Sequence, residues 1–165
     1  MADDKLHTLA TQLGAALKAR GLVLSMAESC TGGMVAQAVT SVAGSSTWFD
    51  RGFVTYSNLS KQEMLKVSDQ TITQFGAVSE QTAFEMAAGA LKNSHAQIAG
   101  SITGIAGPDG GTSEKPVGMV CFAWAVPAKA TSTTTQYFHG NREQIRQQAT
   151  IFMMATLIER LNEFK

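Results

Sequence analysis

Short apolar strand segments alternate with helical segments along most of the chain, and this alternation constrains the fold more than any other feature. Helices are expected over residues 4–20, 34–42, 80–92 and 142–161, with a further helix that begins near Asn58. Strands are expected over residues 22–27, 52–56, 98–103, 117–126 and 133–138, and residues 69–76 are compatible with a short helix. The last two strands are close enough in sequence to pair antiparallel. Strands separated by helices and followed by such a hairpin predict an α/β fold, a three-layer α/β/α domain with a mixed sheet.

The 165 residues contain no linker and no repeat, so a single domain over residues 1–165 is expected. The 13 Lys and Arg residues balance 13 Asp and Glu residues, and the chain has no basic stripe of the kind that binds duplex nucleic acid. The N-terminus lacks the apolar core of a signal peptide, and no apolar run is long enough to cross a bilayer. These features favour a cytoplasmic protein with no nucleic-acid partner and no membrane partner.

The cysteines and histidines argue against disulfide and metal chemistry. Cys30 and Cys121 lie far apart, and His7, His95 and His139 are scattered without the spacing of metal ligands. Neither set suggests a disulfide framework, a zinc site or a histidine-based catalytic triad, so we expect no metal and no cofactor. Only 16% of the residues are charged. A surface with little charge has apolar area to cover, which favours a homodimer.

The first candidate motif, Ala27-Glu-Ser-Cys-Thr-Gly-Gly33, joins the end of a strand to the start of a helix. Glycines allow close approach of the backbone, and the N–H groups at a helix N-terminus can bind an anion or a developing oxyanion. Ser29 or Cys30 lies where a nucleophile would be useful. Taken alone, the pattern favours Ser29 or Thr31 as an ordinary N-cap and Cys30 as a small buried apolar residue.

The second motif, Tyr56-Ser-Asn-Leu-Ser-Lys61, contains a candidate proton-transfer group. Lys61 falls in the first turn of its helix, where the macrodipole opposes a positive charge, and burial would lower its pKa further. A neutral lysine can take a proton from a serine hydroxyl and so replace histidine as general base. The alternatives are a solvated surface lysine and, for Tyr56, a core aromatic residue with a solvated hydroxyl. Ser60 and Glu63 have the spacing of a capping box for this helix.

The third motif, Thr103-Gly-Ile-Ala-Gly-Pro-Asp-Gly-Gly-Thr112, follows a strand and is rich in glycine. A loop of this composition can present backbone amides to a phosphate or a sugar, although it matches neither the Walker A pattern nor GxGxxG. The alternative is an ordinary tight turn into the hairpin, but one turn does not need so many glycines. Arg142 opens the last helix and could serve a phosphate or be an ordinary surface arginine.

Several of these motifs, in this order, resemble the C-terminal domain of the CinA family, and the similarity runs over essentially the whole chain. The segments that carry it are Ala27–Gly33, Gly44-Ser-Ser, Phe53–Asn58 with Lys61, Gly76–Glu80, Thr103–Gly111 and Lys115–Gly118. The resemblance implies an amidohydrolase that converts nicotinamide mononucleotide to nicotinate mononucleotide and ammonia in pyridine-nucleotide (NAD) salvage. Longer members of the family carry an N-terminal domain associated with nucleotide pyrophosphate cleavage, and that activity is not expected here.

The resemblance also implies roles for individual residues. Ser29 would be the nucleophile and Lys61 the proton-transfer partner, with Tyr56 assisting. Backbone amides around residues 31–33 would offer the oxyanion site, and the 103–111 loop with Arg142 would hold the ribose phosphate. The residues expected to bind the substrate are Cys30, Thr31, Gly32, Gly33, Asn58, Thr103, Gly104, Gly107 and Arg142.

Two other functions stay open on the sequence. A non-catalytic nucleotide-binding accessory module of the competence- and damage-inducible type would use the same loops, with Ser29 acting only as a cap. A thiol hydrolase would use Cys30 instead. The residues themselves provide a nucleophile, a base and an oxyanion site for amide hydrolysis. The pyridine-nucleotide substrate rests on the resemblance.

Overall fold

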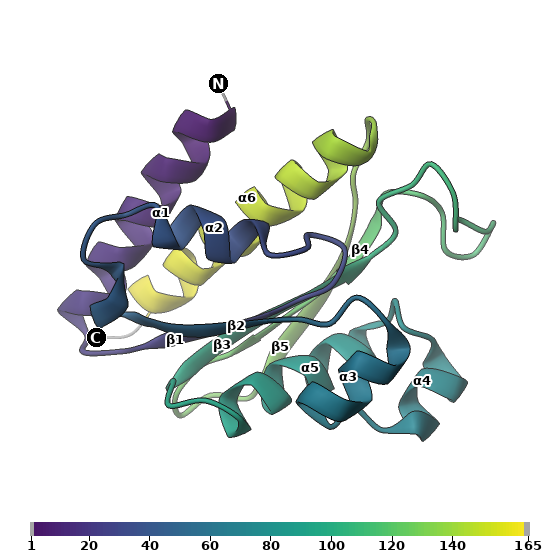
Figure 1. Ribbon diagram of the computed structural model, residues 1–165, viewed down its shortest axis with the longest axis horizontal. Helices are drawn as coiled ribbons and strands as arrows, with labels where there is room; N and C mark the ends of the chain where they lie inside the picture. Colours follow the sequence, from purple (N-terminus) through teal and green to yellow (C-terminus); the bar gives the residue numbers. More distant parts are fainter. Residues whose placement is uncertain (1, 164–165) are drawn as a thin grey trace.

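The computed structural model describes residues 2–163 and consists of a five-stranded sheet with helices on both faces (Figure 1). The strands are β1 (Leu24–Glu28), β2 (Phe49–Val54), β3 (Ile98–Gly104), β4 (Met119–Ala125) and β5 (Ser132–Tyr137). The helices are α1 (Ala2–Ala19), α2 (Met34–Thr40), α3 (Asn58–Leu65), α4 (Asp69–Phe75), α5 (Glu80–Lys92) and α6 (Arg142–Asn162), with a 3-10 turn, η1, at Ser45–Thr47.

The strands lie in the order β2-β1-β3-β4-β5. β1 pairs parallel with β2 and with β3, whereas β3 pairs antiparallel with β4, and β4 with β5. The mixed sheet and the antiparallel hairpin predicted from the sequence are therefore confirmed. Because β1 runs parallel to both neighbours, the carboxyl ends of three strands meet at one edge, where Glu28 pairs with Val54 and with Ile102.

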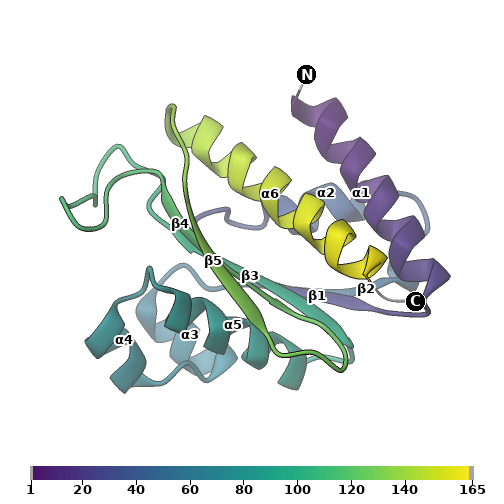
Figure 2. The same cartoon turned by 180° about the vertical axis from the view of Figure 1, so that it is seen from behind.

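Helices α1, α2 and α6 cover one face of the sheet, and α3, α4 and α5 cover the other, as the two opposite views show (Figures 1 and 2). This arrangement confirms the predicted three-layer α/β/α architecture. Strand β4 shows why the two faces differ. Its large side chains, Val120, Phe122 and Trp124, belong to the core under α1 and α6, whereas Cys121 and Ala123 pack with small residues of α5. Small side chains on that face allow α5 to lie close to the sheet.

Helix α5 also lies close to the end of α3. A Cβ atom at Gly89 would be 2.1 Å from the carbonyl oxygen of Leu65, so the two backbones can approach this closely only at a glycine. Helix α6 buries Ile145, Ala149 and Met153, which are spaced by four residues on one face. Within the described residues, no helix combines the length and apolar character needed to span a membrane.

The structure corrects two details of the sequence prediction. Strand β2 ends at Val54, so Tyr56 lies outside the predicted 52–56 strand and its side chain is exposed. The predicted capping box of Ser60 with Glu63 is wrong, because Ser57 is the N-cap of α3 and forms the box with Ser60. Ser57 has an extended backbone, which places Ser60 at the third helical position, where it cannot cap. Residues 69–76 do form a short helix, α4.

Candidate active site

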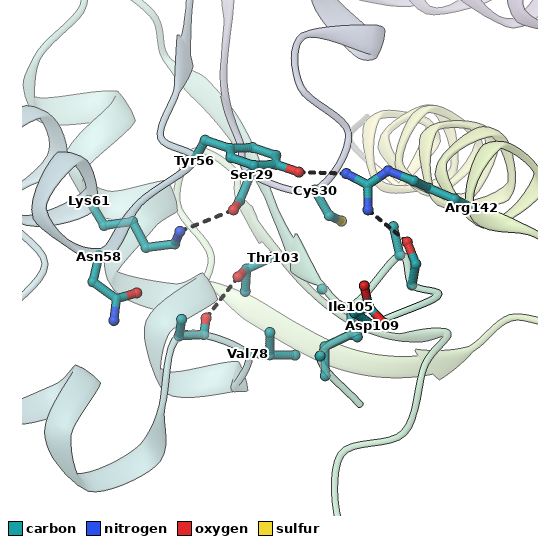
Figure 3. Close-up of a pocket in the computed structure, with 15 residues that line it drawn as sticks. Ser29, Cys30, Tyr56, Asn58, Lys61, Val78, Thr103, Ile105, Asp109 and Arg142 are labelled. Atoms are coloured by element: carbon teal, nitrogen blue, oxygen red, sulfur yellow. Dashed lines mark hydrogen bonds between the residues drawn. The ribbon is translucent and has the colours of Figure 1, made fainter. Parts of the chain in front are cut away.

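A cavity of about 260 Å³ opens at the carboxyl ends of β1 and β3 (Figure 3). Its walls come from five parts of the chain: the turn after β1, the start of α3, the segment between α4 and α5, the glycine-rich loop after β3, and the start of α6. Crevices beyond the carboxyl ends of parallel strands are the usual ligand sites of open α/β sheets. The three motifs singled out in the sequence therefore meet at one place.

Ser29 follows the last residue of β1, and its backbone is held by the neighbouring strand. Its N–H donates to the carbonyl oxygen of Ile102 at 3.0 Å, and its own carbonyl accepts from the N–H of Gly32 at 3.0 Å. The side chain is only 8% exposed, yet it lines the cavity. Neither Ser29 nor Thr31 caps α2, because the N-cap is Gly33 and no side chain caps the helix there. The capping interpretation of Ser29 is therefore wrong.

Lys61 reaches Ser29 from the first turn of α3. Its Nζ donates to Ser29 Oγ at 3.0 Å and to the carbonyl oxygen of Thr55 at 2.8 Å. The side chain is 2% exposed, which excludes the solvated surface lysine. Burial lowers the pKa of Lys61 from its ordinary value of 10.5. A lysine of this kind is neutral more often at physiological pH, and a neutral amine can accept a serine proton.

Cys30 lines the same cavity but is a poor nucleophile. Its side chain is 5% exposed, and burial raises the pKa of the thiol to about 12. The thiolate, which is the nucleophilic form, is therefore scarce at neutral pH. The structure thus argues against the thiol hydrolase.

Tyr56 lies across the cavity with its hydroxyl toward Arg142 (Figure 3). The hydroxyl oxygen accepts from Arg142 Nη2 at 2.5 Å, and Arg142 Nη1 donates to the carbonyl oxygen of Gly107 at 2.8 Å. The structure therefore gives no hydrogen bond from the Tyr56 hydroxyl to Ser29 or Lys61 that would support the expected assisting role of Tyr56. The bridge instead holds the guanidinium of Arg142 at the end of the cavity opposite Lys61 (Figure 3).

The glycine-rich loop forms the wall between these two ends. Thr103 Oγ1 donates to the carbonyl oxygen of Ala77 at 2.7 Å, so this hydroxyl fixes the loop. A Cβ atom at Gly104 would lie 3.1 Å from Cys30 Sγ and 2.7 Å from Val120 Cγ2, which explains the glycine. Asn58, at the start of α3, also lines the cavity.

Thr31, Gly32 and Gly33 do not line the cavity, contrary to the sequence prediction for their amides. The N–H of Gly32 is already bonded to the carbonyl of Ser29. The amides at the N-terminus of α2, those of Val35 and Ala36, donate to the carboxylate of Glu28 at 3.0 and 3.1 Å. The N-terminus of α2, which the sequence predicted as an anion-binding site, thus binds the carboxylate of Glu28.

Sequence reasoning missed two charged residues that shape this site. The sequence prediction includes Glu28 only as part of the motif around Ser29, although a carboxylate shortly before a helix is a common partner for helix amides. The sequence prediction does not include Arg146. Its Nε and Nη2 donate to the carbonyl oxygens of Cys30 and Thr31 at 3.0 and 3.1 Å. Its position one helical turn after Arg142 was the available signal, because both side chains then share one face of α6.

Asp109 also lines the cavity, on the side of Arg142 (Figure 3). The cavity thus carries a carboxylate and a guanidinium at one end and the serine–lysine pair at the other. In the part of the chain from residue 2 to residue 163, no three His, Cys, Asp or Glu side chains come together as a metal site.

Comparison with known proteins shows the family of this chain. A family model described as the CinA C-terminal domain matches residues 6–161. The chain belongs to this family. It is 53% identical over 158 residues to the nicotinamide-nucleotide amidohydrolase PncC of Enterobacter agglomerans, with 96% of each chain covered. It is 54% identical over 157 residues to the protein of the same name from Escherichia coli K12, with 95% of each chain covered.

A solved structure shares the fold. The competence/damage inducible protein CihA from Agrobacterium tumefaciens matches with a TM-score of 0.91 at 45% sequence identity, covering 96% of each chain. The family predicted from the order of the motifs is therefore confirmed, and so is the fold.

Proposed function

We propose that this chain is a nicotinamide-nucleotide amidohydrolase, which converts nicotinamide mononucleotide and water to nicotinate mononucleotide and ammonia in pyridine-nucleotide salvage. The observation that carries the proposal is the 3.0 Å hydrogen bond between Lys61 Nζ and Ser29 Oγ at the wall of a cavity. The names of the Enterobacter agglomerans and Escherichia coli relatives support the substrate.

In the proposed reaction, neutral Lys61 takes the hydroxyl proton of Ser29 as Oγ attacks the carboxamide carbon. The π electrons of the carbonyl move onto its oxygen and form a tetrahedral oxyanion. When the oxyanion collapses, the C–N bond breaks and the Lys61 ammonium gives its proton to the leaving nitrogen, so ammonia departs. The product of this half-reaction is a nicotinate ester of Ser29.

Water then hydrolyses the ester by the same route. Lys61, neutral again, takes a proton from water as the oxygen attacks the ester carbon. The second tetrahedral intermediate releases Ser29 Oγ, which regains its proton from Lys61. The bond from Lys61 Nζ to the Thr55 carbonyl, 2.8 Å long, keeps the amine aimed at Ser29 through both halves.

The proposal assigns the oxyanion to the N–H of Cys30 rather than to the amides around residues 31–33. The Ser29 N–H is committed to Ile102, and the Gly32 N–H to Ser29. Cys30 directly follows the nucleophile and lines the cavity. An amide at that position is the usual oxyanion donor of a nucleophile carried on a strand-to-helix turn.

At the other end of the cavity, the proposal assigns the substrate phosphate to Arg142. A guanidinium binds phosphate through charge-assisted hydrogen bonds, and the bridge to Tyr56 and Gly107 holds it in position before the substrate arrives. Asn58 and the loop residues Thr103, Gly104 and Gly107 would then line the path of the ribose.

The test is ammonia release from nicotinamide mononucleotide by the purified protein, with and without a chelator, beside Ser29→Ala. The native protein is expected to release ammonia in both conditions, and Ser29→Ala is expected to release none while remaining folded. Ser25→Ala is a matched control, because Ser25 is a buried serine of β1 that bonds the carbonyl of Ala90 outside the cavity.

The other outcomes decide between the alternatives. Full activity of Ser29→Ala would refute a serine nucleophile. Thermal stabilisation by the nucleotide without any turnover would identify a nucleotide-binding accessory module instead. Loss of activity with the chelator would point to a metal and contradict the proposed mechanism.

We also propose that the enzyme is a cytoplasmic homodimer. The exposed apolar side chains Val54, Leu59, Met64 and Phe84 support an association that covers part of the surface. Light scattering coupled to gel filtration measures the mass in solution. A mass equal to that of one chain at micromolar concentration would refute the dimer.

A further inference from the structure

Glu28 is a buried carboxylate next to the nucleophile, and the proposed reaction does not use it. It is 1% exposed and is the last residue of β1. Its Oε1 accepts from Thr31 Oγ1 at 2.7 Å and from the Val35 N–H at 3.0 Å, and its Oε2 accepts from the Ala36 N–H at 3.1 Å. Three donors from the turn and from the first turn of α2 hold this carboxylate in place.

These bonds join the two ends of the turn that carries Ser29. The turn leaves the sheet at Glu28 and enters α2 after Gly33, and the Glu28 carboxylate reaches across to the first turn of that helix. The bond to Thr31 adds a third fixed point in the middle of the turn. The path of the chain through Ser29 is therefore closed into a ring by one side chain.

The main chain of Glu28 connects the same turn to Lys61. Its carbonyl oxygen accepts from the Thr55 N–H at 2.8 Å, and the carbonyl oxygen of Thr55 accepts from Lys61 Nζ at 2.8 Å. Glu28 is thus connected both to the nucleophile, as its neighbour in the chain, and to the base, through the hydrogen bonds of Thr55. On the other side of the turn, Arg146 holds the carbonyl oxygens of Cys30 and Thr31.

We propose that Glu28 is a positioning residue, whose carboxylate holds the Ser29 turn against α2 so that Ser29 Oγ stays within reach of Lys61 Nζ. The proposal rests on the proposed function in one respect, the role of Ser29 as a nucleophile. Glu28 itself is not a proton carrier, because its carboxylate bonds Thr31 and the amides of α2 and does not line the cavity.

The variant Glu28→Gln tests this role, because it keeps the size of the side chain but removes the charge. Its amide can accept from one side only, so the turn loses part of its attachment to α2. Displacement of a reacting group by about 1 Å reduces the rate by about 100-fold. We therefore expect kcat for nicotinamide mononucleotide to fall by about 10- to 100-fold in Glu28→Gln, with KM changed less than about twofold.

Glu85→Gln is the matched control. Glu85 is also a carboxylate that stabilises the start of a helix, since it accepts from the N–H of Ser68, the N-cap of α4, at 2.9 Å and from the hydroxyl of Thr71 in the first turn of α4. It does not line the cavity. Glu85→Gln should lose stability in the same way but keep the native kcat. The acidic limb of the rate profile should lie at the same pH in Glu28→Gln as in the native protein, because the limb reports the ionisation of Lys61, whose lowered pKa comes from burial and not from Glu28.

A second measurement does not depend on the substrate. The rate at which a fluorophosphonate labels Ser29, followed by intact mass, reports the nucleophile directly. Labelling should slow by at least about tenfold in Glu28→Gln and not in Glu85→Gln. If the native protein is labelled but does not hydrolyse nicotinamide mononucleotide, the proposed substrate is refuted. The labelling rates of the two variants then decide the positioning role of Glu28 by themselves.

Three results would overturn the inference. One is equal kcat and labelling rates in Glu28→Gln and Glu85→Gln. A second is a shift of the acidic limb in Glu28→Gln, which would make Glu28 part of the proton-transfer system. The third is absence of Ser29 labelling in the native protein. If Glu28→Gln does not fold, Thr31→Val removes one of the three bonds to the carboxylate and should slow labelling in the same direction.

Discussion

Replacing Lys61 with methionine is expected to abolish turnover. It should also change stability in a pH-dependent way: the difference in unfolding free energy between Lys61→Met and the native protein should favour the variant most at neutral pH and less as the pH rises. Lys61 is 2% exposed, and burial lowers its pKa, which means that the folded protein disfavours the ammonium form. Each unit of such a shift corresponds to about 1.4 kcal/mol of unfolding free energy. Methionine has a similar length and carries no charge, so this unfavourable contribution disappears.

The lost hydrogen bonds act in the opposite direction. Nζ donates to Ser29 Oγ and to the Thr55 carbonyl, and each bond contributes about 0.5–1.5 kcal/mol to stability. Loss of both bonds lowers the unfolding free energy of Lys61→Met by about 2 kcal/mol, which corresponds to a decrease in Tm of about 4–8 °C for a domain of this size. The pH dependence separates the two effects, because the hydrogen-bond loss has no titration of its own.

The sign of the pH dependence follows from proton binding. Between the lowered pKa of Lys61 and its unfolded value of 10.5, the unfolded chain holds a proton that the folded chain has released. The free energy of unfolding of the native protein therefore rises with pH in this window. Lys61→Met lacks this rise, so its stability relative to the native protein should decrease as the pH approaches the unfolded pKa.

Urea unfolding of both proteins at several pH values from neutral upward measures this difference. Lys92→Met is the control, since Lys92 is exposed in the last turn of α5 and its removal should give a difference that changes little with pH. The reasoning is refuted if the difference between native protein and Lys61→Met is constant over this range, or if Lys61→Met still releases ammonia.

Three further results are expected. The value of kcat/KM should rise with pH to a plateau, with the midpoint of the rise below 10.5, because Lys61 must be neutral to accept the Ser29 proton and burial lowers its pKa. A kcat/KM that falls as the pH rises toward 10.5 would contradict a lysine base. In steady-state assays, Arg142→Gln should raise KM for nicotinamide mononucleotide by about 10- to 100-fold while changing KM for the ribonucleoside without phosphate only slightly. Equal effects on both substrates would show that Arg142 does not bind the phosphate. Gly89→Ala should lower the unfolding free energy by about 1–3 kcal/mol in a denaturant titration, because the new Cβ would lie 2.1 Å from the Leu65 carbonyl oxygen, and an unchanged midpoint would show that α3 and α5 can move apart freely.

The helices and strands along the chain could be predicted because their signals are local. The buried positions of α1, Leu6, Ala10, Leu13 and Leu17, follow helical spacing, and Ser79 caps α5 with its side chain accepting from the Thr82 N–H. Strand β2 was predicted less well. It begins at Phe49, and its register with β1 includes the charged residue Arg51. Pairing with a neighbouring strand overrides the weak β preference of such residues.

The sequence by itself determined the layered α/β fold, three of the segments that form the site and the candidate roles of Ser29 and Lys61. Only the tertiary structure decided which groups meet. Ser29 and Lys61 are 32 residues apart, and Arg146 lies 116 residues from the Cys30 carbonyl that it binds. Hydrogen bonds require partners placed to within a few tenths of an ångström, and no local periodicity encodes such a distance. The amides of α2 could equally have faced a ligand, and only the packed structure shows that the carboxylate of Glu28 already holds them.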